Sequence, residues 1–309
     1  MTHPTIQNSP SGVLIVNKHA GVTSHDIVNR IRRLYGTRQV GHTGTLDPMA
    51  TGVLVVLIGR AAKASEYLSA DSKCYRATLR LGLTTDTEDI TGAVLTRAEQ
   101  IPDSDAVMSV LPKFRGKIQQ IPPMYSALKV GGKKLVDLAR AGVVLERQAR
   151  EIEIFSLEAQ ATDQPTDYLL NVKCSGGTYI RTLCADIGHA LGCGGVMASL
   201  TRTETGGFSL EQAHTLDALE AMTPEERNSL LFSTESLFET NERVLLPAFY
   251  EKLCRSGCEI YLKKIKKAFP IGTRLRLCNE DGIFFALGEV REYTAGPAIK
   301  AIKTFVLEA

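Results

Sequence analysis

The stretch Gly41-His-Thr-Gly-Thr-Leu-Asp-Pro-Met-Ala-Thr-Gly52 runs directly into the apolar segment Val53-Leu-Val-Val-Leu-Ile58. An unbroken, largely β-branched run of this kind predicts a strand that is buried on both faces. Pro48 restricts its own φ and disfavours helix at Asp47, so the carboxylate lies on a stiff, extended backbone. The sequence therefore predicts a polar, glycine-rich loop fixed to the core at its exit, which is either an ordinary turn or a ligand-binding loop.

Length and composition are those of a globular protein. The chain has 309 residues, of which 44% are hydrophobic and 23% charged, and this length is enough for about two domains. No segment approaches the ~18 apolar residues of a membrane-spanning helix. Residues 1–11 are polar and lack a signal-peptide pattern, so we expect them to be a disordered lead. We expect a cytoplasmic protein with no membrane association.

The seven cysteines are scattered along the chain, and no Cys-x-x-Cys pair occurs. Cys254 and Cys258 have helical spacing, but no second pair completes a zinc site. We therefore expect buried free thiols in a reducing compartment and no structural metal.

The net charge is only +2, but the charges are unevenly distributed. Residues 1–80 carry +6, residues 81–112 carry −5, residues 113–150 carry +7, residues 151–239 carry −10 and residues 240–309 carry +4. Basic regions separated by acidic ones fit a polyanion lying across one face of the protein. An ordinary mosaic of solvated charge fits the same distribution.

The apolar pattern predicts strands and helices in mixed order up to about residue 240. Residues 73–81 alternate in polarity, which places Tyr75 on the buried face of a strand. Ser24 is the expected N-cap of a helix that ends near Gly36, and residues 210–238 are expected to be helical. Further strands are predicted near residues 12–18, 151–158 and 168–174, with another helix after residue 178.

Two segments differ in composition from the rest. Residues 116–145 contain adjacent prolines, adjacent glycines and several lysines, which predict a basic projecting loop with a short helix, able to close over a nucleic-acid backbone. Beyond residue 241, short strands separated by turn residues predict a compact β-rich module.

Six motifs, in order along the chain, resemble those of the bacterial tRNA pseudouridine-55 synthases, the TruB family. They are the loop at 41–52, Tyr75-Arg76, Thr85-Asp-Thr-x-Asp-x-x-Gly92, Gln120-x-Pro-Pro-x-Tyr-Ser-Ala127, Gly177-Thr-Tyr-Ile-Arg181 and Leu200-Thr-Arg-Thr203. The resemblance covers residues 12–240, and the module after it resembles a PUA RNA-binding domain.

The resemblance implies an α+β fold with a mixed, mostly antiparallel central sheet of the pseudouridine synthase type, flanked by helices and loops. A small C-terminal β-rich, PUA-like barrel domain is implied beside it. Residues 12–240 are then the catalytic domain, with a thumb-like loop near 116–145, and residues 241–309 form the RNA-binding domain. The implied partner is tRNA, bound through its T-arm stem-loop. We expect a monomer with no obligatory protein partner.

The resemblance also implies the roles of individual residues. Asp47 is the implied catalytic residue, and Tyr75 is the implied active-site tyrosine. His42 is expected to fill the space that the flipped nucleotide leaves. The implied substrate-contacting residues are His42, Tyr75, Tyr179 and Leu200, and the implied supporting residues are Arg181, Asp89, Lys18 and Arg202. Arg181 is the expected partner that keeps Asp47 ionised.

Conversion of uridine to pseudouridine breaks the N1–C1′ bond, turns the uracil and joins C5 to C1′. No redox change and no net atom transfer occur, so we expect no cofactor. The base has to leave the folded T-loop and be held against rings. The Asp47 carboxylate would attack C1′ or remove a proton from C2′, and the sequence leaves both roles open.

Two other functions fit the same residues. A nucleoside or base hydrolase would pair Asp47 with a second carboxylate from Asp86, Glu88 or Asp89. A non-catalytic RNA-binding or RNA-folding protein would need only the basic regions and the PUA-like tail.

Overall fold

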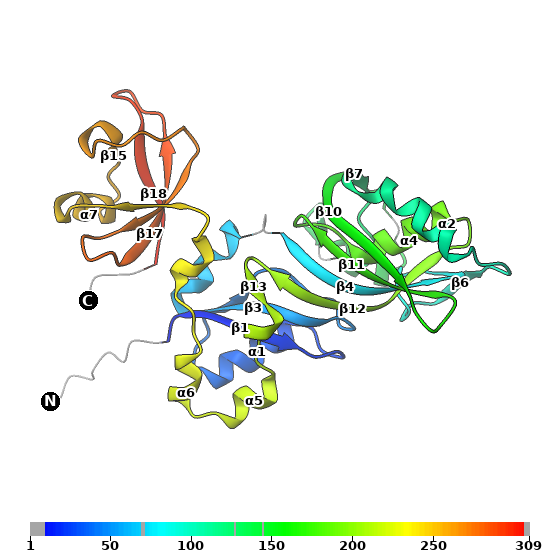
Figure 1. Cartoon of the computed structure of the whole chain (residues 1–309). Helices are drawn as coiled ribbons and strands as arrows, with labels where there is room; N and C mark the ends of the chain where they lie inside the picture. Colours follow the sequence, from blue (N-terminus) through cyan, green and yellow to red (C-terminus); the bar gives the residue numbers. More distant parts are fainter. Residues whose placement is uncertain (1–9, 69–71, 127, 144, 306–309) are drawn as a thin grey trace.

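The computed structural model describes residues 10–68, 72–126, 128–143 and 145–305 (Figure 1). Its central feature is a nine-stranded sheet with the strand order β1-β3-β12-β4-β11-β10-β7, to which β2 and β13 add at β3 and β12. The strands are β1 Gly12–Lys18, β2 Val40–His42, β3 Thr51–Ile58, β4 Lys73–Leu81, β7 Gly116–Gln120, β10 Arg150–Ala161, β11 Asp167–Cys174, β12 Gly195–Thr205 and β13 Phe208–Ser209.

Helices cover this sheet in separate groups (Figure 1). The helix α1 (Ser24–Leu34) packs with α5 (Leu216–Ala221) against β1 and β3. The helix α4 (Ile180–Ala190) packs in the core cluster of β4, β10, β11 and β12. The remaining helices are α2 Ser104–Val110, α3 Leu135–Arg140 and α6 Pro224–Ser229, with 3₁₀ turns at Gly59–Tyr67, Leu111–Phe114, Leu210–Gln212 and Thr234–Phe238.

A second, five-stranded sheet has the order β14-β16-β17-β18-β15 and occupies the C-terminal part of the chain (Figure 1). Its strands are β14 Glu242–Leu245, β15 Ile260–Tyr261, β16 Arg274–Cys278, β17 Phe284–Arg291 and β18 Ala298–Thr304, accompanied by α7 (Ala248–Arg255) and a 3₁₀ turn at Leu262–Lys264. Two small hairpins complete the fold, β5 Leu83–Thr85 with β6 Val94–Arg97, and β8 Lys129–Val130 with β9 Lys133–Lys134. The predicted α+β class, with a mostly antiparallel sheet and a β-rich C-terminal unit, is confirmed.

The strand β3 is buried on both faces, as predicted. Val53, Val55 and Leu57 pack into the cluster that also contains Phe284 and Phe305 of the C-terminal unit. The intervening residues of β3 pack into the cluster beneath α1. Since full burial of one such side chain contributes roughly 1.5–3 kcal/mol, this strand fixes the exit of the 41–52 loop firmly.

Three local predictions need correction. Thr23, not Ser24, is the N-cap of α1, because its hydroxyl accepts from the Asp26 N–H in a capping box. Residues 210–238 form short separate helices in place of one. Pro224 explains one of the breaks, because it lacks an N–H donor and begins a new helix behind the Thr223 cap. Residues 116–120 belong to β7, which pairs with β10, so the projecting segment begins after Gln120.

Glycine at position 52 is required where β3 and β12 meet. Residues 51 and 52 pair in parallel with Thr201 and Arg202. Gly52 has φ +100°, and an added Cβ would lie 2.2 Å from the Arg202 carbonyl oxygen. The two strands approach too closely for any side chain at this position.

We therefore expect Gly52→Ala to lower the free energy of unfolding by about 2 kcal/mol more than Gly36→Ala. Gly36 has φ +61° but open space around its Cβ position, so its substitution reports the backbone strain alone. Urea denaturation of the two variants measures the difference. Equal losses of stability would contradict the close strand approach.

Candidate active site

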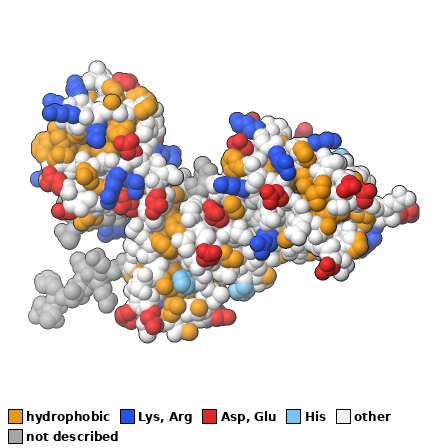
Figure 2. Space-filling view, viewed as in Figure 1, with side chains coloured by type: hydrophobic (Ala, Val, Ile, Leu, Met, Phe, Trp, Pro, Cys, Tyr) orange, Lys and Arg blue, Asp and Glu red, His pale blue; other side chains and the backbone are white. Residues whose placement is uncertain are grey.

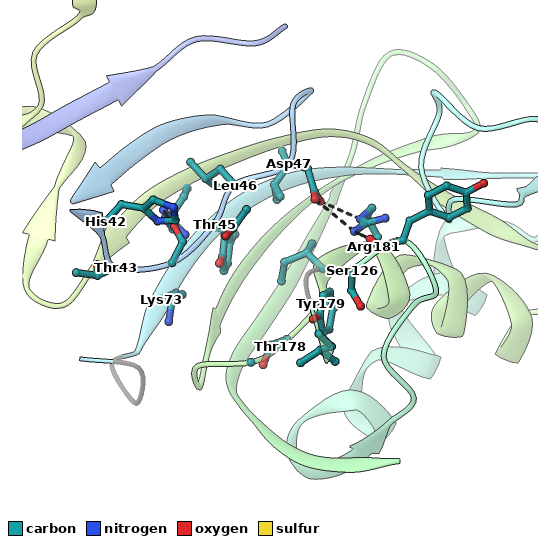
Figure 3. Close-up of a pocket in the computed structure, with 18 of the residues that line it drawn as sticks. His42, Thr43, Thr45, Leu46, Asp47, Lys73, Ser126, Thr178, Tyr179 and Arg181 are labelled. Carbon is teal, nitrogen blue, oxygen red and sulfur yellow. Dashed lines mark hydrogen bonds and ion pairs between the residues drawn. The ribbon is translucent and has the colours of Figure 1, made fainter. Parts of the chain in front are cut away.

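A cavity of about 540 Å³ lies beside the 41–52 loop (Figure 3). Its walls come from that loop, from β4 and β12, from the segment that enters α4 and from Tyr125, Ser126, Leu128 and Val136. The volume falls in the range of roughly 300–1,000 Å³ typical of ligand pockets. The predicted site residues that line this cavity are Asp47, His42, Tyr75, Tyr179, Leu200, Arg181 and Arg202.

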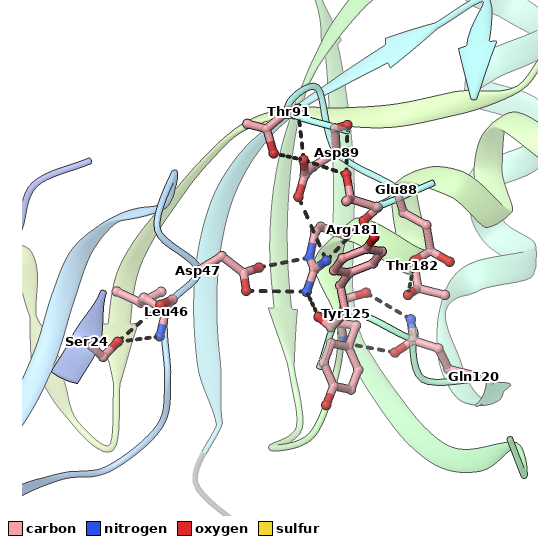
Figure 4. Close-up of polar contacts among 12 residues, drawn as sticks. Ser24, Leu46, Asp47, Glu88, Asp89, Thr91, Gln120, Tyr125, Arg181 and Thr182 are labelled. Atoms are coloured by element: carbon pink, nitrogen blue, oxygen red, sulfur yellow. Dashed lines mark hydrogen bonds and ion pairs between the residues drawn. The ribbon is translucent and has the colours of Figure 1, made fainter. Parts of the chain in front are cut away.

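Asp47 and Arg181 form a two-point ion pair at the cavity wall (Figure 4). Arg181 Nε lies 2.9 Å from Asp47 Oδ2, and Arg181 Nη2 donates to Asp47 Oδ1 at 3.3 Å. The Arg181 side chain is 4% exposed, whereas the Asp47 side chain is 34% exposed. The carboxylate is thus presented to the cavity by a guanidinium that is itself held inside the protein. This confirms the predicted contact between the two side chains.

Other groups hold Arg181 in place (Figure 4). Its Nη1 donates to the Thr87 carbonyl at 3.0 Å, and its Nη2 donates to the Tyr125 carbonyl at 2.9 Å. Asp89 Oδ2 lies 3.8 Å from Nη1. The other Asp89 oxygen accepts hydrogen bonds from Thr87 and Thr91, so Asp89 itself is fixed in orientation. Asp89 therefore pairs with the Arg181 guanidinium without lining the cavity.

The environment of Asp47 sets its proton affinity. Burial raises the pKa of Asp47 above its ordinary value, and the nearby Arg181 charge opposes this increase. The negative charge of Asp89 adds to the increase. Above this raised pKa the Asp47 carboxylate is ionised, and its burial leaves it poorly hydrated. An ionised, poorly hydrated carboxylate can attack carbon or remove a proton.

Lys18 holds the backbone of the Asp47 loop from inside the protein. It is fully buried, and its Nζ donates to the carbonyl oxygens of Pro48 at 3.2 Å and Ala50 at 2.6 Å. Burial lowers the pKa of Lys18 to about 8, although the Asp47 charge acts in the opposite direction. Lys18 does not line the cavity, and its Nζ also donates to the neighbouring His19 carbonyl at 2.9 Å.

Arg202 holds the two ends of the same loop. Its Nε donates to the Val53 carbonyl at 2.7 Å, and its Nη2 donates to the Gly44 carbonyl at 3.1 Å. The side chain is buried. Lys18 and Arg202 thus donate to four backbone carbonyls in and beside the loop, of which the Pro48 carbonyl also accepts from the Gly21 N–H.

Ring side chains and several aliphatic side chains form further parts of the cavity wall. Tyr75 and Leu200 are buried and come from the adjacent strands β4 and β12. Burial raises the pKa of both the Tyr75 and the Tyr179 phenol, so both are protonated near neutral pH. Burial lowers the pKa of His42, which favours its neutral form. The rings of Tyr75, Tyr179 and His42 thus add no net charge to the wall, to which Lys73 and Arg202 also belong.

Sequence reasoning missed the positioning of Tyr179 by Gln120. The buried Gln120 amide donates from Nε2 to the Tyr179 carbonyl at 3.0 Å and accepts from the Tyr179 N–H at 2.8 Å. Sequence reasoning also missed the contact of Ser24 with the loop. The Ser24 hydroxyl accepts from the N–H and donates to the carbonyl of Leu46, the residue before Asp47. Gln120 belongs to one of the recognised motifs, but nothing in sequence spacing places it opposite Tyr179.

Among the described ranges, no group of three or more His, Cys, Asp or Glu side chains could hold a metal ion. In the same part of the chain, no helix is long and apolar enough to cross a membrane.

We expect two substitutions to shift the pKa of Asp47 in opposite directions. Arg181→Gln removes the favourable charge and should raise this pKa further, whereas Asp89→Asn removes a like charge and should lower it. Carboxyl ¹³C titration by NMR, assigned by comparison with Asp47→Asn, measures both shifts in folded samples. Shifts of the same sign would contradict this electrostatic account.

Comparison with known proteins identifies relatives over most of the chain. Residues 32–180 match the family model "TruB family pseudouridylate synthase (N terminal domain)", and residues 181–248 match "tRNA pseudouridylate synthase B C-terminal domain". The chain is 44% identical over 280 residues to tRNA pseudouridine synthase B of Aromatoleum aromaticum, covering 90% of this chain and 88% of the relative. It is 41% identical over 288 residues to the protein of the same name from Burkholderia mallei, covering 93% and 95%.

Solved structures with a similar fold are more distant in sequence. An H/ACA RNP bound to a substrate RNA containing 2′-deoxyuridine has a chain that matches with a TM-score of 0.72 at 22% identity, covering 99% of this chain and 88% of that one. A Cbf5-Nop10-Gar1 complex matches with a TM-score of 0.71 at 24% identity, covering 98% and 88%. These matches support the fold. On the family models and the relatives, this chain belongs to the TruB family of tRNA pseudouridine synthases.

Proposed function

We propose that this enzyme isomerises uridine-55 in the T-loop of tRNA to pseudouridine. The observation that carries the proposal is the Asp47 carboxylate, paired with Arg181 and open to a cavity large enough for a flipped nucleotide. Membership of the TruB family supports tRNA as the substrate. The position in the tRNA and the roles of individual residues are part of the proposal.

In the proposed mechanism the target nucleotide leaves the T-loop and its ribose approaches Asp47. The carboxylate attacks C1′ or removes the C2′ proton, and the N1–C1′ bond breaks in either case. The released uracil turns in the cavity and C5 bonds to C1′. This step displaces the Asp47 carboxylate from C1′ if the carboxylate attacked carbon, or is accompanied by return of the proton from Asp47 to C2′ if it removed one. The C5 proton then passes to solvent while N1 regains a proton. Arg181 keeps Asp47 ionised, and Lys18, Asp89 and Arg202 hold the loop and the guanidinium in place.

Three side chains are proposed to hold the base during these steps. Tyr75, Tyr179 and Leu200 provide flat or apolar surface at the cavity wall, and stacking of a base on a ring contributes about 1–3 kcal/mol. His42 lies at the 41–52 loop end of the cavity and would occupy the space that the flipped nucleotide vacates (Figure 3). Because its raised pKa keeps the Tyr75 phenol protonated near neutral pH, little phenolate is present to accept the C5 proton unless substrate binding lowers this pKa.

The hydrolase alternative lacks its second carboxylate. Among the described residues that line the cavity, Asp47 is the only acidic one. Asp89 is turned towards Thr87, Thr91 and Arg181, and Glu88 is bonded by the Thr182 hydroxyl. Since glycoside hydrolysis usually uses two carboxylates across the bond, isomerisation is the better fit.

We propose that residues 12–240 form the catalytic unit and residues 241–309 a PUA-like RNA-binding unit. The separate apolar cluster of the second sheet supports this division. Lys and Arg side chains lie on that unit and near β7 and β10, mixed with acidic side chains (Figure 2).

We propose a cytoplasmic location for the protein. The expected monomer without protein partners is not confirmed, because a protein of similar fold is found in a Cbf5-Nop10-Gar1 complex.

We expect Asp47→Asn to lower turnover by about 10⁴-fold or more while binding tRNA almost normally, because affinity rests mainly on phosphate contacts. Tritium release from a T-arm stem-loop labelled at uridine C5 measures turnover, and filter binding measures affinity. Asp163→Asn, an exposed substitution with the same charge change, is the control and should retain activity. A large loss of affinity in Asp47→Asn would count against this division of roles.

Binding of tRNA should weaken steeply with salt. The logarithm of the association constant should fall linearly with the logarithm of salt concentration, because Lys and Arg side chains displace counterions from phosphates. Titrations at several salt concentrations with unmodified tRNA give the slope. A flat response would contradict a phosphate-based mode of binding.

A further inference from the structure

Ser126 is a polar residue of the cavity that the mechanism above leaves without a role. It is 5% exposed and lies in the cavity wall beside Tyr179 (Figure 3). Within the part of the chain that the structure describes, its Oγ has no hydrogen-bond partner. The Ser126 hydroxyl lies close enough to the Tyr179 phenol to lower its pKa, but the two hydroxyls do not meet the distance and angle limits of a hydrogen bond.

A buried hydroxyl without a partner is unfavourable for the free protein, and such groups are uncommon in folded proteins. An unpartnered Ser126 hydroxyl in the cavity wall therefore indicates that a ligand group forms a hydrogen bond with it. A group that enters the cavity and bonds Ser126 Oγ removes this cost, so the binding energy of the correct ligand increases.

The backbone around Ser126 is held firmly. Its N–H donates to the Met124 carbonyl at 2.9 Å, and its carbonyl accepts from the Val136 N–H at 3.0 Å. The preceding carbonyl, that of Tyr125, accepts from Arg181 Nη2, the same nitrogen that donates to Asp47. Ser126 therefore directly follows Tyr125, whose carbonyl accepts from the same Arg181 Nη2 that donates to Asp47.

This connection limits which part of the substrate Ser126 can meet. The proposed reaction brings C1′ or C2′ of the ribose against the Asp47 carboxylate. The hydroxyl carried by that part of the sugar is the 2′-hydroxyl, which can both donate and accept. We propose that Ser126 Oγ hydrogen-bonds the ribose 2′-hydroxyl of the flipped uridine and so contributes to the choice of RNA over DNA. This inference rests on the proposed function, since it needs a nucleotide at Asp47.

The first test is the stability of the free protein. Ser126→Ala removes a hydroxyl without a partner and should raise Tm by about 2 °C. Thr178→Val is the matched control, because Thr178 also lines the cavity but its hydroxyl already donates to the Ser175 carbonyl at 3.0 Å. This variant should lower Tm. A lower Tm for Ser126→Ala would show that its hydroxyl is already bonded and would overturn the proposal.

The second test is a binding cycle with two T-arm stem-loops that differ only at the target nucleotide, uridine or 2′-deoxyuridine. It is done in the Asp47→Asn background so that neither RNA is converted. The protein with Ser126 should bind the uridine RNA about tenfold more tightly than the deoxyuridine RNA, and Ser126→Ala should remove this preference. Thr178→Val should retain it.

An equal loss of affinity for both RNAs on Ser126→Ala would place the contact elsewhere on the nucleotide and overturn the assignment to the 2′-hydroxyl. The proposed function is tested separately by tritium release from the wild-type protein. If that activity is present but Ser126→Ala keeps the full preference for uridine, only the Ser126 contact fails. If the activity is absent, the proposed function fails with it.

Discussion

The ion pair between Asp47 and Arg181 is the interaction on which the site depends. A guanidinium that is 4% exposed has to have its donors satisfied, and three separate segments provide the acceptors. These are the loop at Asp47, the turn that contains Thr87 and Asp89, and the Tyr125 carbonyl before Ser126. Segments distant in sequence are thereby held around one guanidinium, and the Asp47 carboxylate is left facing the cavity.

The central sheet makes this convergence possible. Asp47 precedes β3, Tyr75 is on β4 and Leu200 is on β12, and these three strands are neighbours in the sheet. The parallel contact at Gly52 and Arg202 is so close that Arg202 can bond carbonyls at both ends of the loop. The loop is therefore rigid although it is rich in glycine, and a rigid loop positions a catalytic group more accurately than a flexible one.

Much of this arrangement was predictable from sequence. The apolar run 53–58 predicted a strand buried on both faces, and the alternation over 73–81 predicted the inward position of Tyr75, because both follow from local periodicity. The Gln120 amide against Tyr179 and the unpartnered Ser126 hydroxyl were not predictable, because they depend on how distant segments pack. The helices at 210–238 are separate where one helix was predicted, in part because Pro224 begins a new helix.

We propose that the Asp47 cavity turns over one uridine of tRNA. The decisive measurement is to incubate unmodified tRNA with the purified wild-type protein, without added metal or cofactor, and to map pseudouridine at every uridine of the product. We expect pseudouridine at position 55 in the T-loop and no free uracil. Free uracil, or an unchanged tRNA that is nevertheless bound tightly, would contradict it.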